Sequence, residues 1–347
     1  MNIAIKVHCF LLAIFISFGV IFNANAEAGK AQITVLYDAF GKPSNLRKDW
    51  GFSAYIEFGG KRVLFDTGNN AEVFAHNVTA TGIDLTRLDF AIVSHRHGDH
   101  AAGITHLVDV NPELPIYVPK ENFSLFGAAL PGKFLKPNAA LPAEMRYFDG
   151  KVPERLTFGS AWPNGNFQWV TENMEIAPGF HLILLKGPWG VDLDVMEISL
   201  AIDTPNGTVL VVGCSHPTLE KIIEAAAAEI TGKPIQLVLG GMHLLPASEG
   251  EINRIAIKLR DQLNVGYIAP VHCTGETAFE ILQKAFADRY IYAGLGSSVQ
   301  LGEEIVALDI NGKTYTKSKL TAEEAKTYQE MAITSHDFQG NLLAVNQ

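Results

Sequence analysis

The sequence lacks any block of basic residues that could follow the phosphate backbone of a nucleic acid. Its 347 residues include 27 lysines and arginines against 37 aspartates and glutamates, which gives a formal net charge of −10 at pH 7. Nucleic-acid binding depends on cationic side chains that release counterions from phosphates, so we expect no nucleic-acid partner. The hydrophobic content of 48% and the moderate charge are typical of a globular protein.

The N-terminal apolar run is short for a membrane span. It extends from Val7 to Phe22, whereas a helix needs roughly 20 residues to cross a bilayer. The run precedes NANA, in which Ala24 and Ala26 hold the small positions of a cleavage site. We therefore predict a signal peptide at 1–26, a mature chain that begins at Glu27, and a periplasmic or secreted protein without a stable membrane anchor. An uncleaved anchor is the alternative.

Cysteine is scarce. Of the three cysteines, Cys9 lies within the predicted signal peptide, which leaves Cys214 and Cys273 in the mature chain. This number excludes a scaffold held together by several disulfides. Because an exported protein meets an oxidising compartment, the two remaining cysteines can still form one disulfide.

An internal repeat at a fixed period is also missing. The early part of the mature chain contains strand patterns and one helix pattern: strands at 31–40, 51–68, 88–95 and 114–119, and a helix at 70–82. The later part alternates strands with amphipathic helices: strands at 196–216, 234–243 and 265–275, and helices at 219–232, 251–264 and 275–289. Glycine pairs and an Asn-Gly pair mark hairpin turns at 59–60 and 206–207. This order predicts a layered α/β domain over 27–315, followed by a polar tail at 316–347.

Residues from about 120 to about 190 differ from the rest of the domain. They are rich in glycine, proline and aromatic residues, and their hydrophobic periodicity is weak. We interpret this segment as an insertion or a lid. A second hairpin layer that packs its own aromatic side chains is the alternative interpretation.

Histidine is concentrated directly after four predicted strands. The motifs are SHRHGDH at 94–100, GCSH at 213–216, GGMH at 240–243 and PVHCTG at 270–275. The carboxyl ends of strands in α/β folds open onto one edge, where ligands usually bind. The sequence therefore brings its imidazoles to the place where a binding site is expected.

The spacing of the first motif suits metal ions. Residues i and i+2 of an extended segment point to the same side, so His95 and His97 can bind one ion. Asp99 and His100, one step further, can turn to a second ion nearby. Imidazole and carboxylate are ligands for zinc, and two metals close together can share a hydroxide and lower its pKa to about 7.

The segment FAIVSHRHGDHAAGI resembles the signature of the metallo-β-lactamase superfamily, and WGFSAYIEFGGKRVLFDTG resembles the hairpin that precedes it. VVGCSHPTLEKIIEAA, LVLGGMHLL and IAPVHCTGETA resemble one branch, the metal-dependent hydrolases grouped with dihydropterin-ribofuranosylaminobenzene 5′-phosphate synthase. The resemblance covers roughly residues 31 to 300 apart from the variable stretch. It implies an αββα four-layer sandwich with metals at one edge of the two sheets.

The resemblance also implies metal ligands. Five residues match the superfamily pattern, two at a first metal and three at a second: His95 and His97, then Asp99, His100 and His272. Asp66, in LFDTG, matches the acid that supports the site by hydrogen bonding to a ligand.

Two positions depart from that pattern. Most members have a histidine at the start of the strand pair that ends at the bridging acid, but this region reads GVDLDVMEISL, with Asp194 and no histidine. We choose His216 as the missing ligand of the first metal, with Asp194 and His243 as alternatives. His243 can instead contact substrate or donate to an oxyanion.

Cys214 stands where an aspartate usually bridges the two metals. A thiolate at this position would bind zinc tightly. The second interpretation is a small buried residue beside the site. The third is a disulfide to Cys273, which follows another strand that ends at the same edge. Without a disulfide, we expect Cys273 to support the neighbouring ligand His272.

These features predict an exported hydrolase that uses a metal-bound hydroxide on a small-molecule ester, amide or phosphoester. We expect two zinc ions per chain, with iron and manganese as alternatives. Asp99 would act as a ligand and a proton acceptor, and His243 is the other candidate catalytic residue.

Three alternative functions follow from the same motifs. They are a transferase like the synthase of that branch, a β-lactamase, and a metal-binding or sensory protein without turnover. A serine hydrolase is not supported, because GCSHP lacks the second glycine of a nucleophile elbow. A di-iron redox site is disfavoured because His97 stands where such members have glutamate.

Overall fold

Residues 31–121, 124–187 and 195–315 are described by the computed structural model. The predicted signal peptide, the mature start at Glu27, the polar tail at 316–347 and Asp194 lie outside these ranges. Within them, no helix combines the length and the apolar character needed to cross a membrane.

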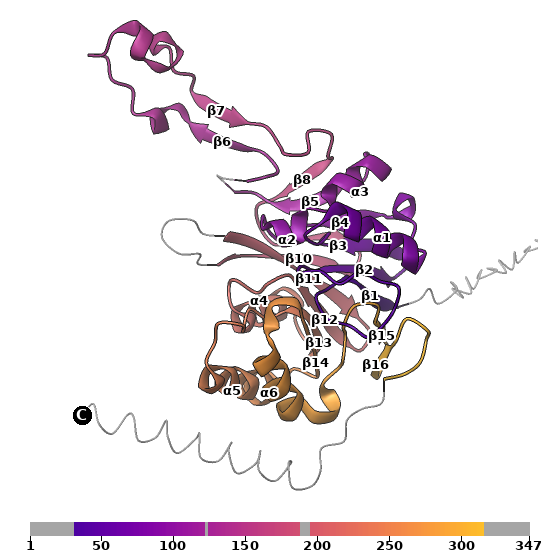
Figure 1. The fold of residues 1–347 in the computed structure, drawn as a ribbon. Helices are drawn as coiled ribbons and strands as arrows, with labels where there is room; N and C mark the ends of the chain where they lie inside the picture. The colour runs from indigo at the N-terminus through magenta and orange to yellow at the C-terminus, as the bar shows by residue number, and fades with distance from the viewer. Residues whose placement is uncertain (1–30, 122–123, 188–194, 316–347) are drawn as a thin grey trace, which may run out of the picture.

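Two β-sheets form the centre of the molecule (Figure 1). The first sheet has eight strands, in the spatial order β16 (Ile305–Leu308), β15 (Ser298–Leu301), β1 (Gln32–Tyr37), β2 (Ser53–Phe58), β3 (Lys61–Phe65), β4 (Phe90–Ile92), β5 (Ile116–Pro119) and β8 (Phe167–Val170). The second has six, in the order β14 (Tyr267–Val271), β13 (Ile235–Gly241), β12 (Gly207–Val212), β11 (Val195–Thr204), β10 (Phe180–Gly187) and β9 (Met174–Ala177). Strands β3, β4, β5 and β8 are parallel to one another, as are β12, β13 and β14.

The main core lies between the two sheets. Alternate residues of the strands point into it, which is why the strand sequences alternate or, when both faces are covered, are apolar throughout. Phe180 of the second sheet contacts two aromatic rings of the first, Phe58 at 5.9 Å and Phe90 at 5.6 Å between centroids. These contacts hold the sheets face to face.

Helices cover the outer face of each sheet. The first sheet packs against α1 (Ala71–Thr81) and α3 (Ile104–Val110), and the second against α4 (Leu219–Glu229), α5 (Glu249–Ile257) and α6 (Glu276–Phe286). The remaining short helices of the sandwich are α2 (Gly98–Ala101), η1 (Leu85–Arg87), η5 (Lys258–Gln262), η6 (His272–Thr274) and η7 (Ala287–Arg289). The order helix, sheet, sheet, helix confirms the αββα sandwich.

Local turn and cap signals also match the structure. Gly59 and Gly60 have φ values of 55° and 77°, which a tight hairpin between β2 and β3 requires and which glycine tolerates. The side chain of Asn70 caps the start of α1, and Gly82 ends it in the left-handed conformation. These residues explain why the boundaries of α1 and of this hairpin are readable from the sequence.

The segment at 120–190 is not one insertion, so that part of the expectation is wrong. Residues 167–170 and 174–187 form β8, β9 and β10, which belong to the two main sheets. β8 and β9 are edge strands and are largely exposed, so their sequences carry little hydrophobic alternation. This exposure accounts for the weak periodicity of the segment.

Residues 124–166 form a separate projection, here named the arm. It contains β6 (Ala128–Pro131), β7 (Arg155–Phe158), η2 (Gly132–Leu135), η3 (Ala143–Met145) and η4 (Tyr147–Gly150), and Figure 1 shows it extending away from the sandwich. Phe126 anchors its base in the core beneath the first sheet. Phe134, Tyr147 and Phe148 are more than half exposed, so the arm does not bury all its aromatic rings in a layer of its own.

Candidate metal centre

The predicted site residues lie where parallel strands end at one edge of the sandwich. β4 leads to His95, β12 to Cys214 and His216, and β14 to His272. Hydrogen bonds or short contacts between their side chains join the ends of both sheets. The topology therefore assembles motifs that are more than a hundred residues apart.

Backbone strain is concentrated at these strand ends. Asp66, Ser215, His243 and His272 have φ values of 59°, 65°, 51° and 50°, in the left-handed region that disfavours residues with a side chain. Each lies within three residues of the end of a strand. Such conformations persist where the surrounding structure holds them, and they are frequent at functional sites.

The glycines of GCSH and GGMH allow the strand ends to approach each other. A Cβ atom on Gly213 would lie 2.3 Å from the Ser94 Oγ, and one on Gly241 would lie 2.9 Å from the Cys273 Sγ. Both distances are too short for a side chain without movement of the neighbours. The glycines are thus part of the packing that brings Ser94 and Cys273 toward the site.

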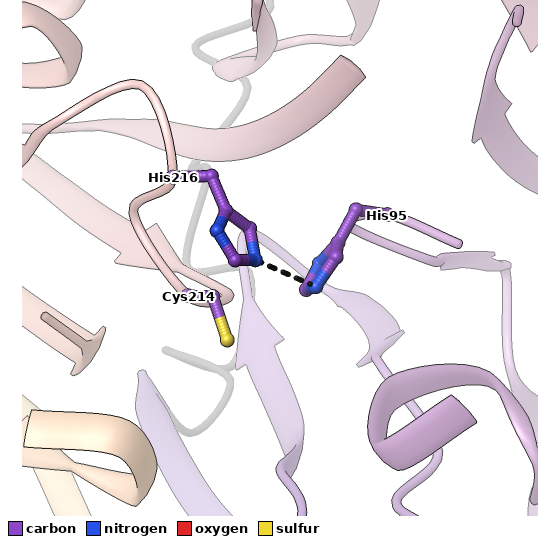
Figure 2. Close-up of side chains that lie close together, drawn as sticks. All are labelled: His95, Cys214 and His216. Atoms are coloured by element: carbon purple, nitrogen blue, oxygen red, sulfur yellow. Dashed lines mark hydrogen bonds between the residues drawn. The ribbon is translucent and has the colours of Figure 1, made fainter. Parts of the chain in front are cut away.

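Three imidazole nitrogens face one another in the first half of the centre. His95 Nε2 lies 2.9 Å from His97 Nδ1 and 3.3 Å from His216 Nε2, and the last two atoms are 3.2 Å apart. Figure 2 shows His95 and His216 pointing toward each other from the two sheets, with Cys214 beside them. These three histidines are named the imidazole set. The structure thus brings His216 to the two histidines of the first motif, and its role as a metal ligand stays a prediction.

A second group of donors adjoins the first. His100 Nε2 lies 3.1 Å from His272 Nε2, and Asp99 Oδ2 lies 3.4 Å from His272 Nε2 and 3.9 Å from His100 Nε2. Asp99, His100 and His272 are named the mixed set. The rings of His95 and His100 are 4.3 Å apart between centroids, so the two sets are neighbours.

Cys214 lies between the two sets. Its Sγ is 3.1 Å from His100 Nε2, and its ligand atom is within 4.8 Å of those of His95 and His216 on one side and of His100 and His272 on the other. This is the place of a bridging donor. The Sγ atoms of Cys214 and Cys273 are 3.4 Å apart and both cysteines are free, so the structure does not contain the disulfide considered as an alternative.

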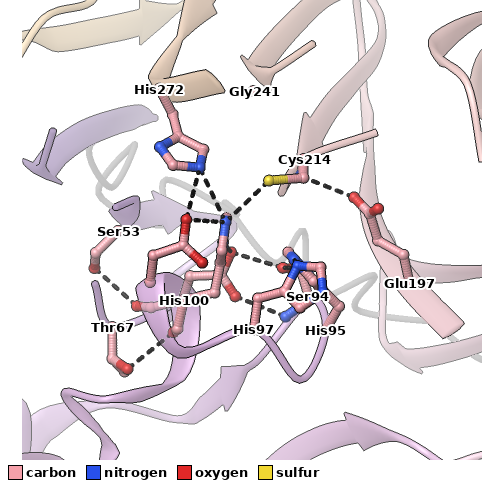
Figure 3. A network of polar contacts seen from close by, with 12 residues as sticks. Ser53, Thr67, Ser94, His95, His97, His100, Glu197, Cys214, Gly241 and His272 are labelled. Carbon is pink, nitrogen blue, oxygen red and sulfur yellow. Dashed lines mark hydrogen bonds and ion pairs between the residues drawn. The ribbon is translucent and has the colours of Figure 1, made fainter. Parts of the chain in front are cut away.

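Asp66 and Ser94 orient one histidine in each set. Figure 3 labels Ser94 and the two histidines, His95 and His100. The Asp66 carboxylate accepts from the Ser94 hydroxyl at 2.8 Å and binds His100 Nδ1 at 2.7 Å. Since the Ser94 proton goes to Asp66, its oxygen accepts from His95 Nδ1 at 2.8 Å. In its neutral form each of the two histidines therefore carries its proton on Nδ1, and the lone pair of Nε2 is directed into the centre.

Glu197 supports the loop that carries Cys214 and His216. It is buried, and its carboxylate accepts backbone hydrogen bonds from Cys214 at 2.9 Å, Ser215 at 2.8 Å and His216 at 2.7 Å. Burial raises the pKa of Glu197 to about 7. This residue holds the turn that presents both side chains to the centre.

Asp38 and Trp50 support the mixed set. Asp38 is fully buried and accepts the backbone N–H of His272 at 3.0 Å, and burial raises its pKa to about 8. The indole Nε1 of Trp50 donates to Asp99 Oδ2 at 3.0 Å, and its ring lies 4.9 Å from the ring of His272. Asp38 thus fixes the backbone of His272, and Trp50 fixes the Oδ2 atom of Asp99.

Sequence reasoning did not identify Asp38, Trp50 or Glu197 as parts of the centre. Asp38 follows a buried strand, and Glu197 is an acid between the apolar Met196 and Ile198 of β11. A charged residue in such a position is rarely left unpaired, and this signal could have found both. Trp50 carries no comparable signal, because its partner Asp99 is 49 residues away.

Arg96 connects the first motif with the base of the arm. Its guanidinium forms an ion pair with Glu121, which also accepts the backbone N–H of Met196 at 2.8 Å. Burial raises the pKa of Glu121. Arg96, which stands between His95 and His97 in the sequence, thus pairs with an acid that is bound to the start of β11.

The protonation states of the imidazole set favour metal binding. Burial lowers the pKa of His97 to about 4, and burial together with nearby histidines lowers that of His216 to about 3. The pKa of the buried His95 is lowered well below its ordinary value for the same reasons. All three are neutral near pH 7, as metal ligands must be.

The mixed set carries charge. Burial alone would lower the pKa of His100, but the adjacent Asp66 carboxylate raises it to about 9. Burial alone would raise the pKa of Asp99, but the hydrogen bond with His272 and the charge of His100 lower it below its usual range. An anion and a cation thus adjoin within this set.

The donors suit zinc in type and in spacing. Imidazole, carboxylate and thiolate are its usual ligands, and nitrogens about 2.0–2.1 Å from one tetrahedral ion are about 3.3 Å apart. The donor distances are 2.9–3.3 Å in the imidazole set and 3.1–3.9 Å in the mixed set. The type and the spacing of the donors therefore fit a pair of metal ions.

His243 lies at the margin of the centre. It is exposed, its ring is 4.5 Å from that of His216, and it hydrogen bonds to Cys273. The hydrogen bond with Cys273 raises the pKa of His243. His243 is thus beside the imidazole set rather than within it, and the other alternative ligand, Asp194, lies outside the described residues.

Known proteins resemble this chain in sequence and in structure. A family model described as the metallo-beta-lactamase superfamily matches residues 51–272. The chain is 28% identical, over 74% of its length and 92% of the relative's, to the 7,8-dihydropterin-6-methyl-4-(beta-D-ribofuranosyl)-aminobenzene-5′-phosphate synthase of Methanocaldococcus jannaschii.

Solved structures show the same fold. A metal-dependent hydrolase of the beta-lactamase superfamily is 27% identical, with a TM-score of 0.59 over 78% of this chain and 99% of that one. The metallo-beta-lactamase fold protein YhfI of Bacillus subtilis is 16% identical, with a TM-score of 0.50 over 78% of this chain and 98% of that one, which shows the fold alone. Since the family model spans more than half of the 347 residues, the chain belongs to the metallo-β-lactamase superfamily.

Proposed function

We propose that this chain is an exported hydrolase that holds two zinc ions and acts on a small-molecule ester, amide or phosphoester. The observation that carries the proposal is the adjoining pair of donor sets, each with three side-chain donors at ligand spacing. Membership of the superfamily supports a metal-dependent hydrolase fold. The predicted signal peptide supports export.

The imidazole set and the mixed set would hold the zinc ions, which would supply Lewis acidity and would lower the pKa of a water molecule to about 7. The chain's own residues set the geometry for that chemistry. Asp66 and Ser94 fix the tautomers of His95 and His100, and Glu197 fixes the loop of His216. The centre is therefore held in place by hydrogen bonds before any substrate arrives.

Asp99 is better suited to bind metal than to accept a proton. Its lowered pKa makes it a weak base, and Trp50 holds its Oδ2 beside His272. The exposed His243, beside the imidazole set, is placed to contact a substrate that enters from solvent. We therefore assign Asp99 to the metals and His243 to the substrate.

A synthase-like transferase is the second candidate. The observation that favours it is the 28% identity to the archaeal synthase across 92% of that protein. A synthase assay tests this candidate. Mass spectrometry shows whether the protein forms the dihydropterin-aminobenzene phosphate compound that the relative's name gives. Product formation without hydrolysis of any test substrate would favour this candidate over the hydrolase.

A substrate panel tests the proposed hydrolase. The mature protein, loaded with zinc, is assayed with a chromogenic ester, a phosphodiester and a β-lactam. We expect at least one substrate to be hydrolysed, with activity lost after chelation and restored by zinc. The variant His181→Ala, which changes a histidine of β10 outside the centre, serves as the control. Hydrolysis that continues unchanged after the metal is removed by a chelator would contradict the proposal.

Export is tested separately. N-terminal sequencing of the exported protein shows whether the chain is cleaved before Glu27.

A further inference from the structure

Two thiols and an imidazole meet beside the two donor sets. Cys214, His243 and Cys273 follow β12, β13 and β14, three parallel neighbours in the second sheet. Their ligand atoms all lie within 4.8 Å of one another. Because adjacent parallel strands end side by side, this cluster is a direct product of the sheet order.

The contacts within the cluster are specific. The Cys273 thiol lies 3.4 Å from the Cys214 Sγ, and Cys273 also hydrogen bonds to His243. Both cysteines are buried and free, whereas His243 is exposed. His243 has a φ of 51°, and its ligand atom lies within 4.8 Å of both sulfurs. The cluster is therefore closed on the protein side and reachable from solvent through one imidazole.

The donor chemistry differs from that of the two other sets. Two sulfurs and one nitrogen form a soft ligand group, which selects thiophilic cations such as copper(I) and cadmium over hard oxygen-seeking ions. Sulfurs about 2.3 Å from one tetrahedral ion are about 3.8 Å apart, so the observed 3.4 Å requires a shift of a few tenths of an ångström.

We propose that Cys214, Cys273 and His243 form a third metal position, which binds a thiophilic d¹⁰ cation at the edge of the centre. Cys214 is shared between this position and the two donor sets. An ion here uses the imidazole of His243, so its binding competes with contact between His243 and a substrate. The position does not depend on the proposed hydrolysis.

Cadmium titration tests the third position without any substrate. The reduced protein, with the imidazole and mixed sets first filled with zinc, is titrated with cadmium while the ultraviolet thiolate-to-cadmium charge-transfer band is recorded. We expect the band to reach the intensity of two thiolates, and Cys273→Ser to reduce it to about half. His243→Ala keeps the band but weakens cadmium binding by about tenfold or more.

Cys214→Ser is the matched comparison for Cys273→Ser, because Cys214 belongs to the third position and also adjoins both donor sets. Circular dichroism and retention of zinc show whether each variant folds, and alkylation followed by mass spectrometry shows whether cadmium protects both thiols. A band and a protection pattern of Cys273→Ser equal to those of the parent, or no band at all, would overturn the third position. Failure of the substrate panel would leave this titration unaffected, so the two proposals fail separately.

Discussion

The imidazole set and the mixed set are neighbours, with the rings of His95 and His100 only 4.3 Å apart, yet they differ in charge. Burial keeps the imidazole set neutral. The mixed set contains the anionic Asp99 and a His100 whose pKa is raised to about 9. Positions with such different donors are expected to bind their ions with different strength and different pH dependence.

The two sets also differ in how they are supported. The imidazole set depends on Ser94 and on the loop that Glu197 holds, whereas the mixed set depends on Asp66, Asp38 and Trp50. Asp66 reaches both, because it binds His100 directly and His95 through Ser94. Variants of Glu197 and Trp50 can therefore weaken one set more than the other, whereas a variant of Asp66 is expected to weaken both.

Loss of a ligand has the largest expected effect. His216→Ala removes one donor of the imidazole set and His272→Ala removes one of the mixed set. Each change is expected to lower kcat/KM by more than about 100-fold, the upper range for a residue that only supports a ligand. Steady-state assays on the substrate identified by the panel measure it. Equal activity of either variant and the His181→Ala control would show that the set concerned has no part in turnover.

The pH dependence of zinc binding is the second expected difference. His100 of the metal-free protein carries a proton below a pKa of about 9, so zinc at the mixed set competes with that proton. Affinity there is expected to rise with pH by up to about tenfold per unit, or about 100-fold between about pH 6 and about pH 8. His97 and His216, with pKa values of about 4 and about 3, are already neutral in this range, so the imidazole set is expected to show a smaller slope than the mixed set.

Competition with a chromophoric chelator measures both affinities. His272→Ala isolates the imidazole set and His216→Ala isolates the mixed set. The same slope in both variants would remove the distinction between the sets.

Glu197→Gln is expected to weaken the imidazole set more than the mixed set, because Glu197 holds the backbone of His216 as well as that of Cys214. The carboxylate accepts three backbone hydrogen bonds, and an amide offers one oxygen while its NH₂ group faces the N–H donors. Zinc affinity of the imidazole set should fall by about 10- to 100-fold. Glu175→Gln, at an exposed position of β9, is the control, and a change no larger than that of the control would show that the loop needs no such support.

Trp50→Phe has the smallest expected effect and concerns the mixed set. The substitution removes the hydrogen bond to Asp99 Oδ2 but keeps an aromatic ring beside His272. A hydrogen bond contributes about 1 kcal/mol, so zinc affinity of the mixed set should fall by about fivefold. Isothermal titration of the parent and the variant measures the difference, and an effect confined to the imidazole set would contradict the assignment.

Local rules explain what was predictable from the sequence. The αββα fold follows from strand alternation, the glycine turns and the capped helices, together with the family resemblance. His95, His97, Asp99 and His100 are spaced for metal within one motif. His216 and His272 could be placed beside them because both follow buried strands that end at one edge.

Contacts between distant segments could not be predicted from the sequence. Glu197 and Asp38 act on backbone groups 17 to 234 residues away, and no local pattern reports such a pairing. The segment at 120–190 differs from the expected single insertion because exposed edge strands resemble loops in composition. The state of Cys214 also depended on geometry, since only the structure shows a free thiol 3.4 Å from Cys273.

Metal content is the most direct test of the central claim that two adjoining donor sets hold two ions. The mature protein and its His216→Ala and His272→Ala variants are saturated with zinc, desalted and analysed by inductively coupled plasma mass spectrometry in the presence of a mild chelator that clears weak sites. We predict about two zinc ions per chain in the parent and about one in each variant. A parent protein that retains no zinc, or variants that both retain as much as the parent, would contradict the account.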